Sequence, residues 1–128
     1  MTKEDRERLL KDLGGRLPYG VKILDIPTNV VGKLFLISTT DTVQYETTDD
    51  TGIQTLYNIK PYLFPLSSMT EEEQRTLDSM CNGVEMVSRL SGLKMFDKAF
   101  NWLNKNHFDY RGLIESGLAI DATNLNIY

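Results

Sequence analysis

The sequence has one cysteine, one histidine and no long apolar run. With only Cys81, the chain cannot form an internal disulfide, which is typical of proteins from a reducing compartment. No stretch approaches the roughly 18 apolar residues that a membrane-spanning helix needs, and the charged start MTKEDRERLL is unlike a secretory signal. These absences predict a cytoplasmic protein that has no membrane segment.

Motifs that hold metals, phosphates or cofactors are also missing. One histidine and one cysteine, without a CxxC or HxxxH spacing, leave only scattered carboxylates as metal ligands. No cluster of glycines stands between a strand and a helix, where a phosphate-binding loop would lie. We therefore expect no metal, no cofactor and no catalytic residue. An enzyme whose site has no sequence signature is a third possibility, after the two functions given below.

Strongly basic segments are absent as well. The formal net charge is −4, and basic and acidic residues number five and four in 2–16, three and five in 17–66, and six and nine in 67–128. A protein that binds nucleic acid through its phosphates normally carries a clustered excess of lysine and arginine. The charge pattern therefore disfavours nucleic-acid binding without excluding it.

What is present is the composition of an ordinary globular protein. The 128 residues are 41% hydrophobic and 25% charged, which argues against a disordered or collagen-like chain. A chain of this length can bury one hydrophobic core without disulfides or metals. We expect a single domain over residues 1–128, with a helix (1–15), a β-rich part (16–66) and a helical part (67–128).

The N-terminal helix has signals for both its ends. Thr2 and Asp5 have the spacing of a capping box, although aspartate replaces the usual glutamate. The apolar edge is narrow and consists of leucines (Leu9, Leu10 and Leu13). Gly14-Gly15 should end the helix. So short an amphipathic helix must pack on another element to persist.

The β-rich part alternates apolar and polar residues with period two at 42–46 and 53–59, as half-buried strands do. TDDTG (48–52) between these runs predicts a turn, and PTN between VKILDI and VVGKLFLIS predicts a second hairpin. Residues 34–37 are apolar on both faces and should form a central, covered strand. The two prolines of IKPYLFPLSS exclude helix and predict an extended segment.

Helical spacing returns after residue 69. Thr70 and Glu73 form a capping box, and Cys81 falls on the apolar side of the helix that follows. Asn82-Gly83 should end that helix, and 84–93 is expected to be a loop or short strand. A second helix is predicted over 94–106. Its apolar face comprises Phe96, Ala99, Phe100 and Leu103, and its opposite face comprises Lys94, Lys98, Asn101 and Lys105.

These elements predict an α+β fold. An N-terminal helix precedes a small antiparallel β-meander, either closed as an SH3-like barrel or open as a four- to five-stranded sheet, and the C-terminal helices pack on it.

Two motifs resemble catalytic ones. Asp-Thr-Gly at 50–52 is the tripeptide of aspartic proteases, but the polar residues YETTD before it cannot bury a carboxylate pair, so a turn is the better interpretation. Cys81 and His107 could serve as nucleophile and base. A cysteine on an apolar helix face, without a hydrolase signature, is instead expected to be a packing residue.

The stretch HFDYRGL (107–113) concentrates histidine, aromatics and arginine. We interpret it as a corner in which His107 ends a helix, Asp109 caps the next turn and Gly112 loosens the bend. The alternative is a partner-binding surface, because tyrosine and arginine are enriched at binding hot spots. Tyr110 and Arg111 are the residues we expect to be exposed for such a role.

Two stretches, KPYLFPLSSMTEEE (60–73) and NHFDYRGLIESGLA (106–119), together resemble a group of small uncharacterised proteins carried in gut-bacterial chromosomes, prophages and mobile elements. The group has no known activity, so the resemblance transfers no functional residue. It implies an accessory protein of a mobile element. We therefore expect a non-enzymatic interaction protein with an unknown protein partner, and the alternative is a nucleic-acid-associated small-barrel protein.

Overall fold

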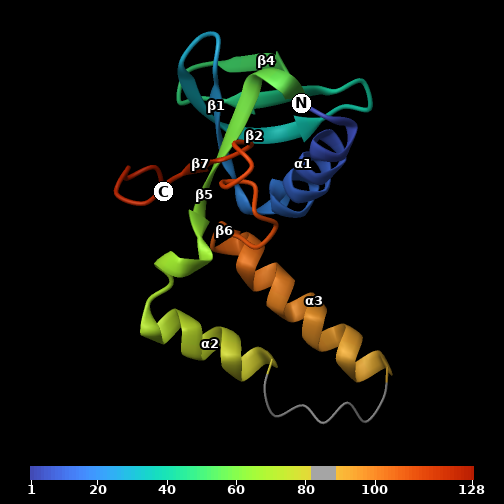
Figure 1. Cartoon of the computed structure of the whole chain (residues 1–128). Helices are drawn as coiled ribbons and strands as arrows, with labels where there is room; N and C mark the ends of the chain where they lie inside the picture. Colours follow the sequence, from blue (N-terminus) through green and yellow to red (C-terminus); the bar gives the residue numbers. More distant parts are fainter. Residues whose placement is uncertain (82–88) are drawn as a thin grey trace.

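In the computed structural model, which describes residues 1–81 and 89–128, a sheet is flanked by helices on one face and at its lower end (Figure 1). The helices are α1 (Lys3–Arg16), α2 (Glu71–Cys81) and α3 (Arg89–Lys105). The strands are β1 (Lys22–Asp25), β2 (Val30–Ile37), β3 (Thr42–Glu46), β4 (Thr51–Thr55), β5 (Ile59–Pro65), β6 (Phe108–Asp109) and β7 (Ile120–Asp121). No helix within the described ranges is long and apolar enough to cross a membrane.

The strands form an open sheet in the order β4-β3-β2-β1-β5-β6, and β7 also pairs with β5. The pairs from β4 through to β5 are antiparallel, whereas β6 and β7 run parallel to β5. The predicted α+β class, with an N-terminal helix and an antiparallel meander, is confirmed. Of the two forms considered, the meander takes the open sheet.

Strand β5 connects the two ends of the molecule (Figure 1). Its first half pairs with β1, and its second half pairs with β6 and β7. The extended conformation predicted for residues 59–68 is confirmed for Ile59–Pro65, whereas Leu66–Ser68 form a 3₁₀ turn. Through this strand the C-terminal segments join the sheet.

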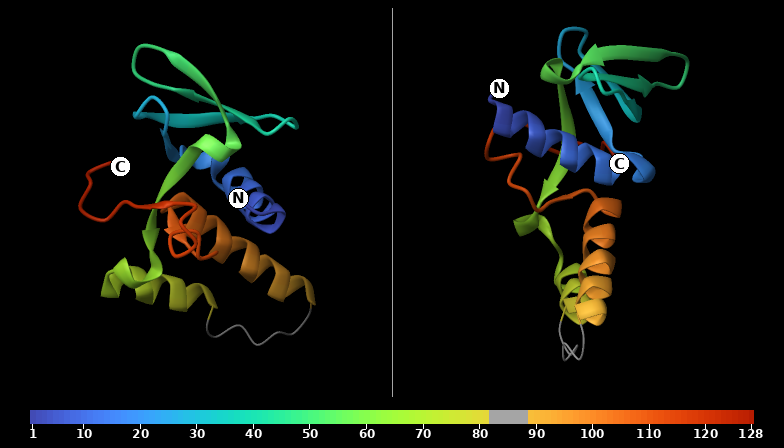
Figure 2. Two further views of the ribbon diagram at one scale, coloured as in Figure 1. Left: turned by 45° about the horizontal axis from the view of Figure 1, so that its top comes forward. Right: turned by 90° about the vertical axis from the view of Figure 1, so that its right-hand side faces the viewer.

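Helix α1 covers one face of the sheet, while α2 and α3 pack against each other below it (Figure 2). Leu9 and Leu13 of α1 are fully buried against apolar side chains of the sheet and of the C-terminal segment. The main members of this core are Val21, Ile23, Leu34, Val43, Tyr45, Leu56, Ile59, Leu63, Leu113 and Leu118. The core explains how a short, charged helix persists.

The predicted capping boxes of α1 and α2 are both confirmed. The Thr2 hydroxyl accepts from Asp5 N at 3.0 Å, and the Asp5 carboxylate accepts from Thr2 N at 3.2 Å. Thr70 and Glu73 make the same reciprocal bonds. A capping box depends only on two residues three positions apart, so it can be predicted without knowledge of the tertiary structure.

The predicted end of α1 at Gly14-Gly15 is wrong. The helix continues to Arg16, a 3₁₀ turn follows, and Gly20 with φ 71° then reverses the chain. Gly15 is instead a contact position, because a Cβ there would lie 3.1 Å from Nδ2 of Asn104. Its lack of a side chain lets α1 approach α3 closely.

Strand β2 is central, but it is not covered on both faces as predicted. Leu34 is buried, whereas Phe35 and Leu36 are exposed, and the register with β3 shifts between Leu34 and Leu36. The bulge disrupts the alternation, and α1 covers only one face of the sheet. The apolar run therefore predicted correctly that β2 lies in the middle of the sheet, but wrongly that both its faces are buried.

The prediction for the segment before residue 94 is partly wrong. Helix α3 begins at Arg89, whereas a loop or short strand was expected there; 84–88 and the predicted stop at 82–83 lie outside the described residues. Cys81, expected on a buried face, is exposed. On α3, Ala99 and Leu103 are buried as predicted, but Phe96 and Phe100 are exposed by 48% and 45%.

Candidate functional site

The segment after α3 is a corner, as the sequence indicated. His107 adopts φ 62° in the left-handed region, and its N–H donates to the Asn104 carbonyl at 3.1 Å. The His107 carbonyl then accepts from Phe64 N at 2.8 Å, which joins the corner to β5. Gly112, with φ 71°, bends the chain a second time.

Asp109 holds the second bend. Its buried carboxylate accepts from the backbone N–H groups of Arg111, Leu113 and Ile114 at 3.3, 3.0 and 2.9 Å. Three donors on one carboxylate fix the backbone of this turn, as an N-cap does. The predicted capping role of Asp109 is confirmed.

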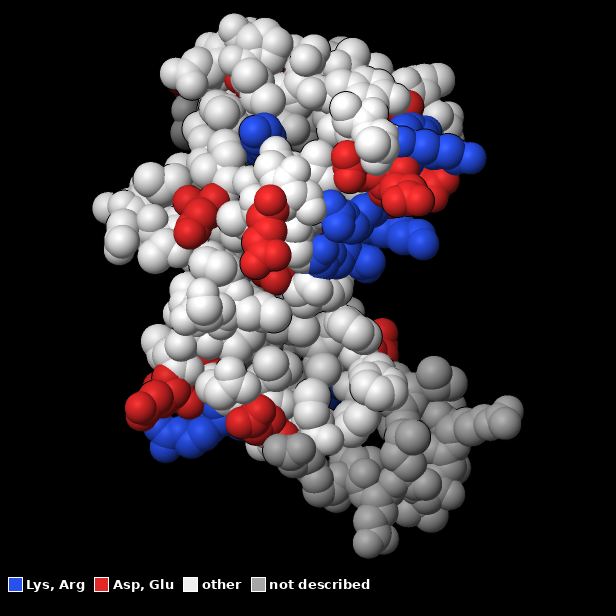
Figure 3. All heavy atoms as spheres, in the orientation of Figure 1, with Lys and Arg blue, Asp and Glu red and all other residues white. Residues whose placement is uncertain are grey.

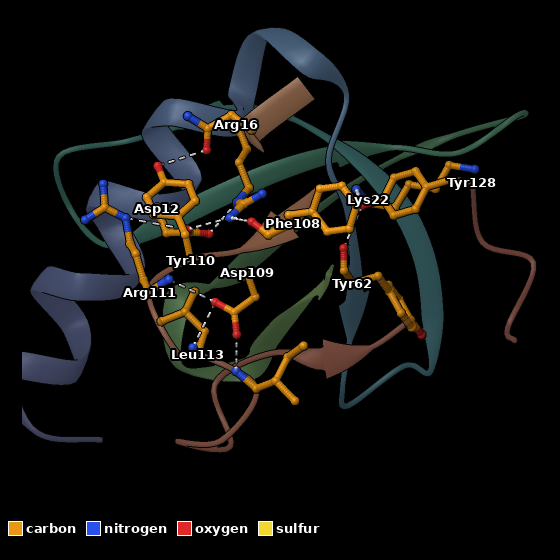
Figure 4. A network of polar contacts seen from close by, with 12 residues as sticks. Asp12, Arg16, Lys22, Tyr62, Phe108, Asp109, Tyr110, Arg111, Leu113 and Tyr128 are labelled. Atoms are coloured by element: carbon orange, nitrogen blue, oxygen red, sulfur yellow. Dashed lines mark hydrogen bonds and ion pairs between the residues drawn. The ribbon is translucent and has the colours of Figure 1, made fainter. Parts of the chain in front are cut away.

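A buried ion pair links α1 to this corner (Figure 4). Arg16 and Asp12 are both 0% exposed, with Nε–Oδ2 at 2.8 Å and Nη2–Oδ1 at 3.1 Å. Nη2 of Arg16 also donates to the Phe108 carbonyl at 2.6 Å. A fully desolvated pair that is also hydrogen-bonded to backbone fixes the corner against α1.

Tyr110 is a half-buried side chain whose ring lies between two guanidinium groups. The Cζ atoms of Arg16 and Arg111 lie 5.4 and 5.1 Å from the ring centroid. The hydroxyl donates to Asn104 Oδ1 at 3.1 Å, and the Phe100 ring lies 5.2 Å away. These contacts hold the ring in one orientation.

Arg111 is less completely engaged. Its side chain is 32% exposed, and its Nε lies 3.6 Å from Asp12 Oδ1, which is too far for a hydrogen bond. Among the residues described, that Nε has no hydrogen-bond partner. That Nε is itself buried, so the part of the side chain that a ligand could reach is the exposed remainder of the guanidinium group.

These side chains line a hollow of about 500 Å³, formed by Gly15, Phe100, Asn104, Tyr110 and Arg111. Phe96 lies one helical turn before Phe100 on α3 and extends the exposed apolar surface. We call this surface, Phe96 together with the five lining residues, the corner groove. It combines exposed aromatic rings with a surface arginine.

The structure thus places Tyr110 and Arg111, the predicted partner-binding residues, beside Phe100. Phe100 and Phe96, one turn before it on α3, are two phenylalanines that the sequence assigned to the core. Helical periodicity predicted that these phenylalanines share a face of α3 with Leu103. It could not predict that only part of this face is covered by other segments of the chain. Asp12 and Arg16 were not predicted at the site, because nothing local in the sequence connects them with residues 108–111.

His107 lies outside the corner groove. Its ring stacks on that of Tyr128, with centroids 3.8 Å apart and planes at 11°. Both line a second hollow of about 400 Å³, whose other members are Phe64, Ser68, Glu73, Lys105, Asn106, Phe108, Thr123 and Asn124. Cys81 is not among these residues, so the hypothetical cysteine–histidine pair is not assembled there.

Both rings of this stack have shifted pKa values. Burial, followed by the positive charges of Arg16 and Lys22, lowers the pKa of His107 to about 4. Burial raises the pKa of Tyr128 to about 12. Although 43% of that residue is exposed, its hydroxyl is enclosed between Lys22 N at 2.9 Å and the Tyr62 carbonyl at 2.8 Å. Both rings are therefore neutral near pH 7.

We predict that His107 makes the protein less stable at acid pH. Because its folded-state pKa lies below the ordinary value of 6.5, its contribution is complete above pH 6.5 and is lost as the pH falls toward 4. With allowance for solvent screening of a half-buried ring, we expect a loss of about 1–2 kcal/mol. Urea unfolding between pH 7 and 4 measures it.

The matched control is His107→Asn, since asparagine tolerates positive φ and does not titrate. Carboxylates titrate in the same pH range in both proteins, so the difference between the two pH profiles isolates the imidazole. Profiles that run parallel from pH 7 to 4 would contradict the prediction.

The Asp-Thr-Gly motif serves a structural purpose. Asp50 is exposed, its Oδ1 accepts from Thr51 N at 2.8 Å, and its own N–H donates to the Thr47 hydroxyl at 3.0 Å. The predicted turn is therefore confirmed at 48–50, while Thr51 and Gly52 already belong to β4. Gly52 lies directly under the Tyr45 ring.

The polar face of α3 is as predicted, since Lys94, Lys98, Asn101 and Lys105 are all exposed. Positive and negative side chains nevertheless lie in small neighbouring groups over the face shown in Figure 3, without a continuous basic band among the residues drawn there in colour. Where residues 1–81 and 89–128 are concerned, no group of His, Cys, Asp and Glu could hold a metal ion.

Comparison of the chain with protein-family models, with curated proteins and with solved structures found no match. The corner groove therefore has to be interpreted from its own geometry.

Proposed function

We propose that the protein is a cytoplasmic interaction module that binds a partner protein through the corner groove. The observation that carries the proposal is the exposure of Phe100 beside Tyr110 and Arg111, with the exposed Phe96 one helical turn away on α3. Aromatic and arginine side chains in a rigid, concave setting are the usual anchors of protein interfaces.

The rigidity of the groove supports this proposal. Asp109 fixes the turn that carries Arg111, and the buried Asp12–Arg16 pair fixes that turn against α1. A surface that is already ordered loses less conformational entropy when it binds. The buried polar contacts therefore serve the groove as well as the fold.

A pull-down with matched variants tests the proposal. Tagged wild-type protein, Phe100→Ser and Ile53→Ser are compared in lysate from the source cells. Ile53 is the matched control, since it is 67% exposed on β4, away from the groove. We expect a partner that wild type and Ile53→Ser retain equally and that Phe100→Ser loses by about tenfold or more, as for a hot-spot residue.

Thermal unfolding of all three proteins shows whether they are folded. A partner that is retained equally by Phe100→Ser would place the interface elsewhere. Loss from Ile53→Ser alone would point to the exposed face of the sheet.

Nucleic-acid binding is the second candidate, favoured by the exposed lysines on α3. Contact with phosphates releases counterions, so affinity should fall steeply as salt is added. Absence of binding to DNA and RNA at low salt would remove this candidate. The acidic balance of the chain makes it the weaker one.

We further propose that the protein is an accessory protein of a prophage or mobile element. The support is the resemblance of residues 60–73 and 106–119 to proteins of that kind. These stretches contain much of β5 and the whole corner at 107–113. Proteins that share them would therefore share the turn that carries Tyr110 and Arg111. The genes that flank the coding sequence test the assignment.

A further inference from the structure

The guanidinium groups of Arg16 and Arg111 carry more N–H donors than there are acceptors within hydrogen-bond distance of them. Both oxygens of Asp12 are hydrogen-bonded to Arg16, at 2.8 and 3.1 Å, and Arg111 has a longer contact of 3.6 Å with the same carboxylate. Asp109, the other nearby carboxylate, already accepts three backbone N–H groups. Neither acid completes the hydrogen bonding of Arg111.

A second donor in the same cluster is also unsatisfied. Nη1 of Arg16 has no acceptor among the described residues, although the side chain is 0% exposed. Buried donors in folded proteins nearly always have a partner. Two positively charged groups thus flank Tyr110, and one shared carboxylate balances them.

The apolar part of the groove lies beside this donor-rich end. Phe96 and Phe100 are four residues apart, so they occupy neighbouring positions on one face of α3. The Phe100 ring lies 5.2 Å from the Tyr110 ring, which in turn lies under the Arg111 guanidinium. An exposed apolar surface therefore lies directly beside a partly exposed guanidinium group whose nearest carboxylate is 3.6 Å away.

We infer that the corner groove recognises a peptide segment of a partner protein in which an aspartate or glutamate stands beside a large apolar side chain. The carboxylate pairs with Arg111, and the apolar side chain packs on Phe100 and Phe96. A planar guanidinium can bind a carboxylate through two parallel hydrogen bonds, which lysine cannot do. The inference rests on the proposed function and adds the chemistry of the partner.

Selection from a random peptide library displayed on phage tests the inference, with full-length wild type and Phe100→Ser as targets. We expect peptides that are enriched on wild type alone to carry an acid next to a large apolar residue. A synthetic peptide from this set is then titrated calorimetrically, together with a version in which its acid is replaced by the corresponding amide.

The titration includes Arg111→Ala, Arg111→Lys and, as matched control, Lys98→Ala, which removes another exposed cation from the opposite face of α3. We expect the acidic peptide to bind Arg111→Ala about tenfold more weakly than wild type, because a charge-assisted pair is lost. Arg111→Lys should be intermediate, and Lys98→Ala unchanged. The amide peptide should bind wild type and Arg111→Ala equally.

The other outcomes overturn the inference in distinguishable ways. Peptides that need Phe100 but carry no acid, or that bind Arg111→Ala as tightly as wild type, would refute carboxylate recognition while the proposed function stands. Selection of no Phe100-dependent peptide would count against both. Self-association that depends on Arg111, measured by sedimentation, would make a second copy of this chain the occupant, and binding of an oligonucleotide that depends on Arg111 would make it a phosphate.

Discussion

Asp12→Ala should lower the free energy of unfolding by about 3–5 kcal/mol, the usual cost of removing one partner of a buried ion pair. The substitution leaves the Arg16 guanidinium, which is 0% exposed, without its carboxylate. Arg16 also holds the Phe108 carbonyl, so the corner should loosen along with α1. Urea unfolding at neutral pH measures the change.

The partly exposed pair of Arg6 and Asp41 is the control. Its Nε–Oδ2 distance of 2.7 Å resembles that of the buried pair, but both side chains are partly accessible to water. We expect Asp41→Asn, which removes the charge and tolerates the positive φ of 62° at this position, to cost only about 0–1 kcal/mol. In addition, Asp12→Ala/Arg16→Met should recover part of the loss, because no charge is then left buried. Equal costs at Asp12 and Asp41 would contradict the account of the buried pair.

Gly52→Ala should also destabilise the protein strongly, by about 2–3 kcal/mol, as overpacking of a core does. A Cβ at this position would lie 2.3 Å from Cζ of Tyr45, and the same ring lies against Gly32. The ring cannot easily move, because its hydroxyl donates to the buried Asp25 carboxylate at 2.6 Å. Denaturant unfolding of the variant gives the measurement.

Gly14→Ala should have the opposite effect. No atom lies within 4 Å of a Cβ at that position, and alanine is favoured over glycine inside a helix by about 0.5–1 kcal/mol. Tyr45→Ala should also remove most of the cost of Gly52→Ala, since the clash is with that ring. A Gly52→Ala protein as stable as wild type would show that the strands adjust, and that the Tyr45 ring does not require a glycine at this position.

Features that depend on neighbouring residues were predicted well from the sequence. The two capping boxes, the hairpins and the Asp109 turn each depend on side chains a few residues from the backbone groups they bind. The sequence left two forms open, a closed barrel and an open sheet. Alternation of apolar and polar residues predicts strands, but it does not show whether the two edge strands of the sheet pair with each other. Local chemistry determined these features, so one sequence was enough.

Features that depend on distant segments were not predicted. The bond from Arg16 to the Phe108 carbonyl joins residues 92 positions apart, and no local pattern indicates it. The same limit applies to Gly14-Gly15, where packing of Leu13 and Arg16 outweighs the tendency of glycine to end a helix. Sequence alone could nominate Tyr110 and Arg111, but only the arrangement of α1, α3 and the corner makes them part of a groove.

Site-specific photocrosslinking tests most directly whether the corner groove is the binding surface. A photoreactive phenylalanine analogue replaces Phe96 in one protein and Ile53 in another, and both are irradiated in the source cells. We expect position 96 to yield a discrete adduct that disappears when Arg111→Ala and Phe100→Ser are added, and position 53 to yield none. An adduct at position 53 alone, or one at position 96 that survives both substitutions, would contradict the account.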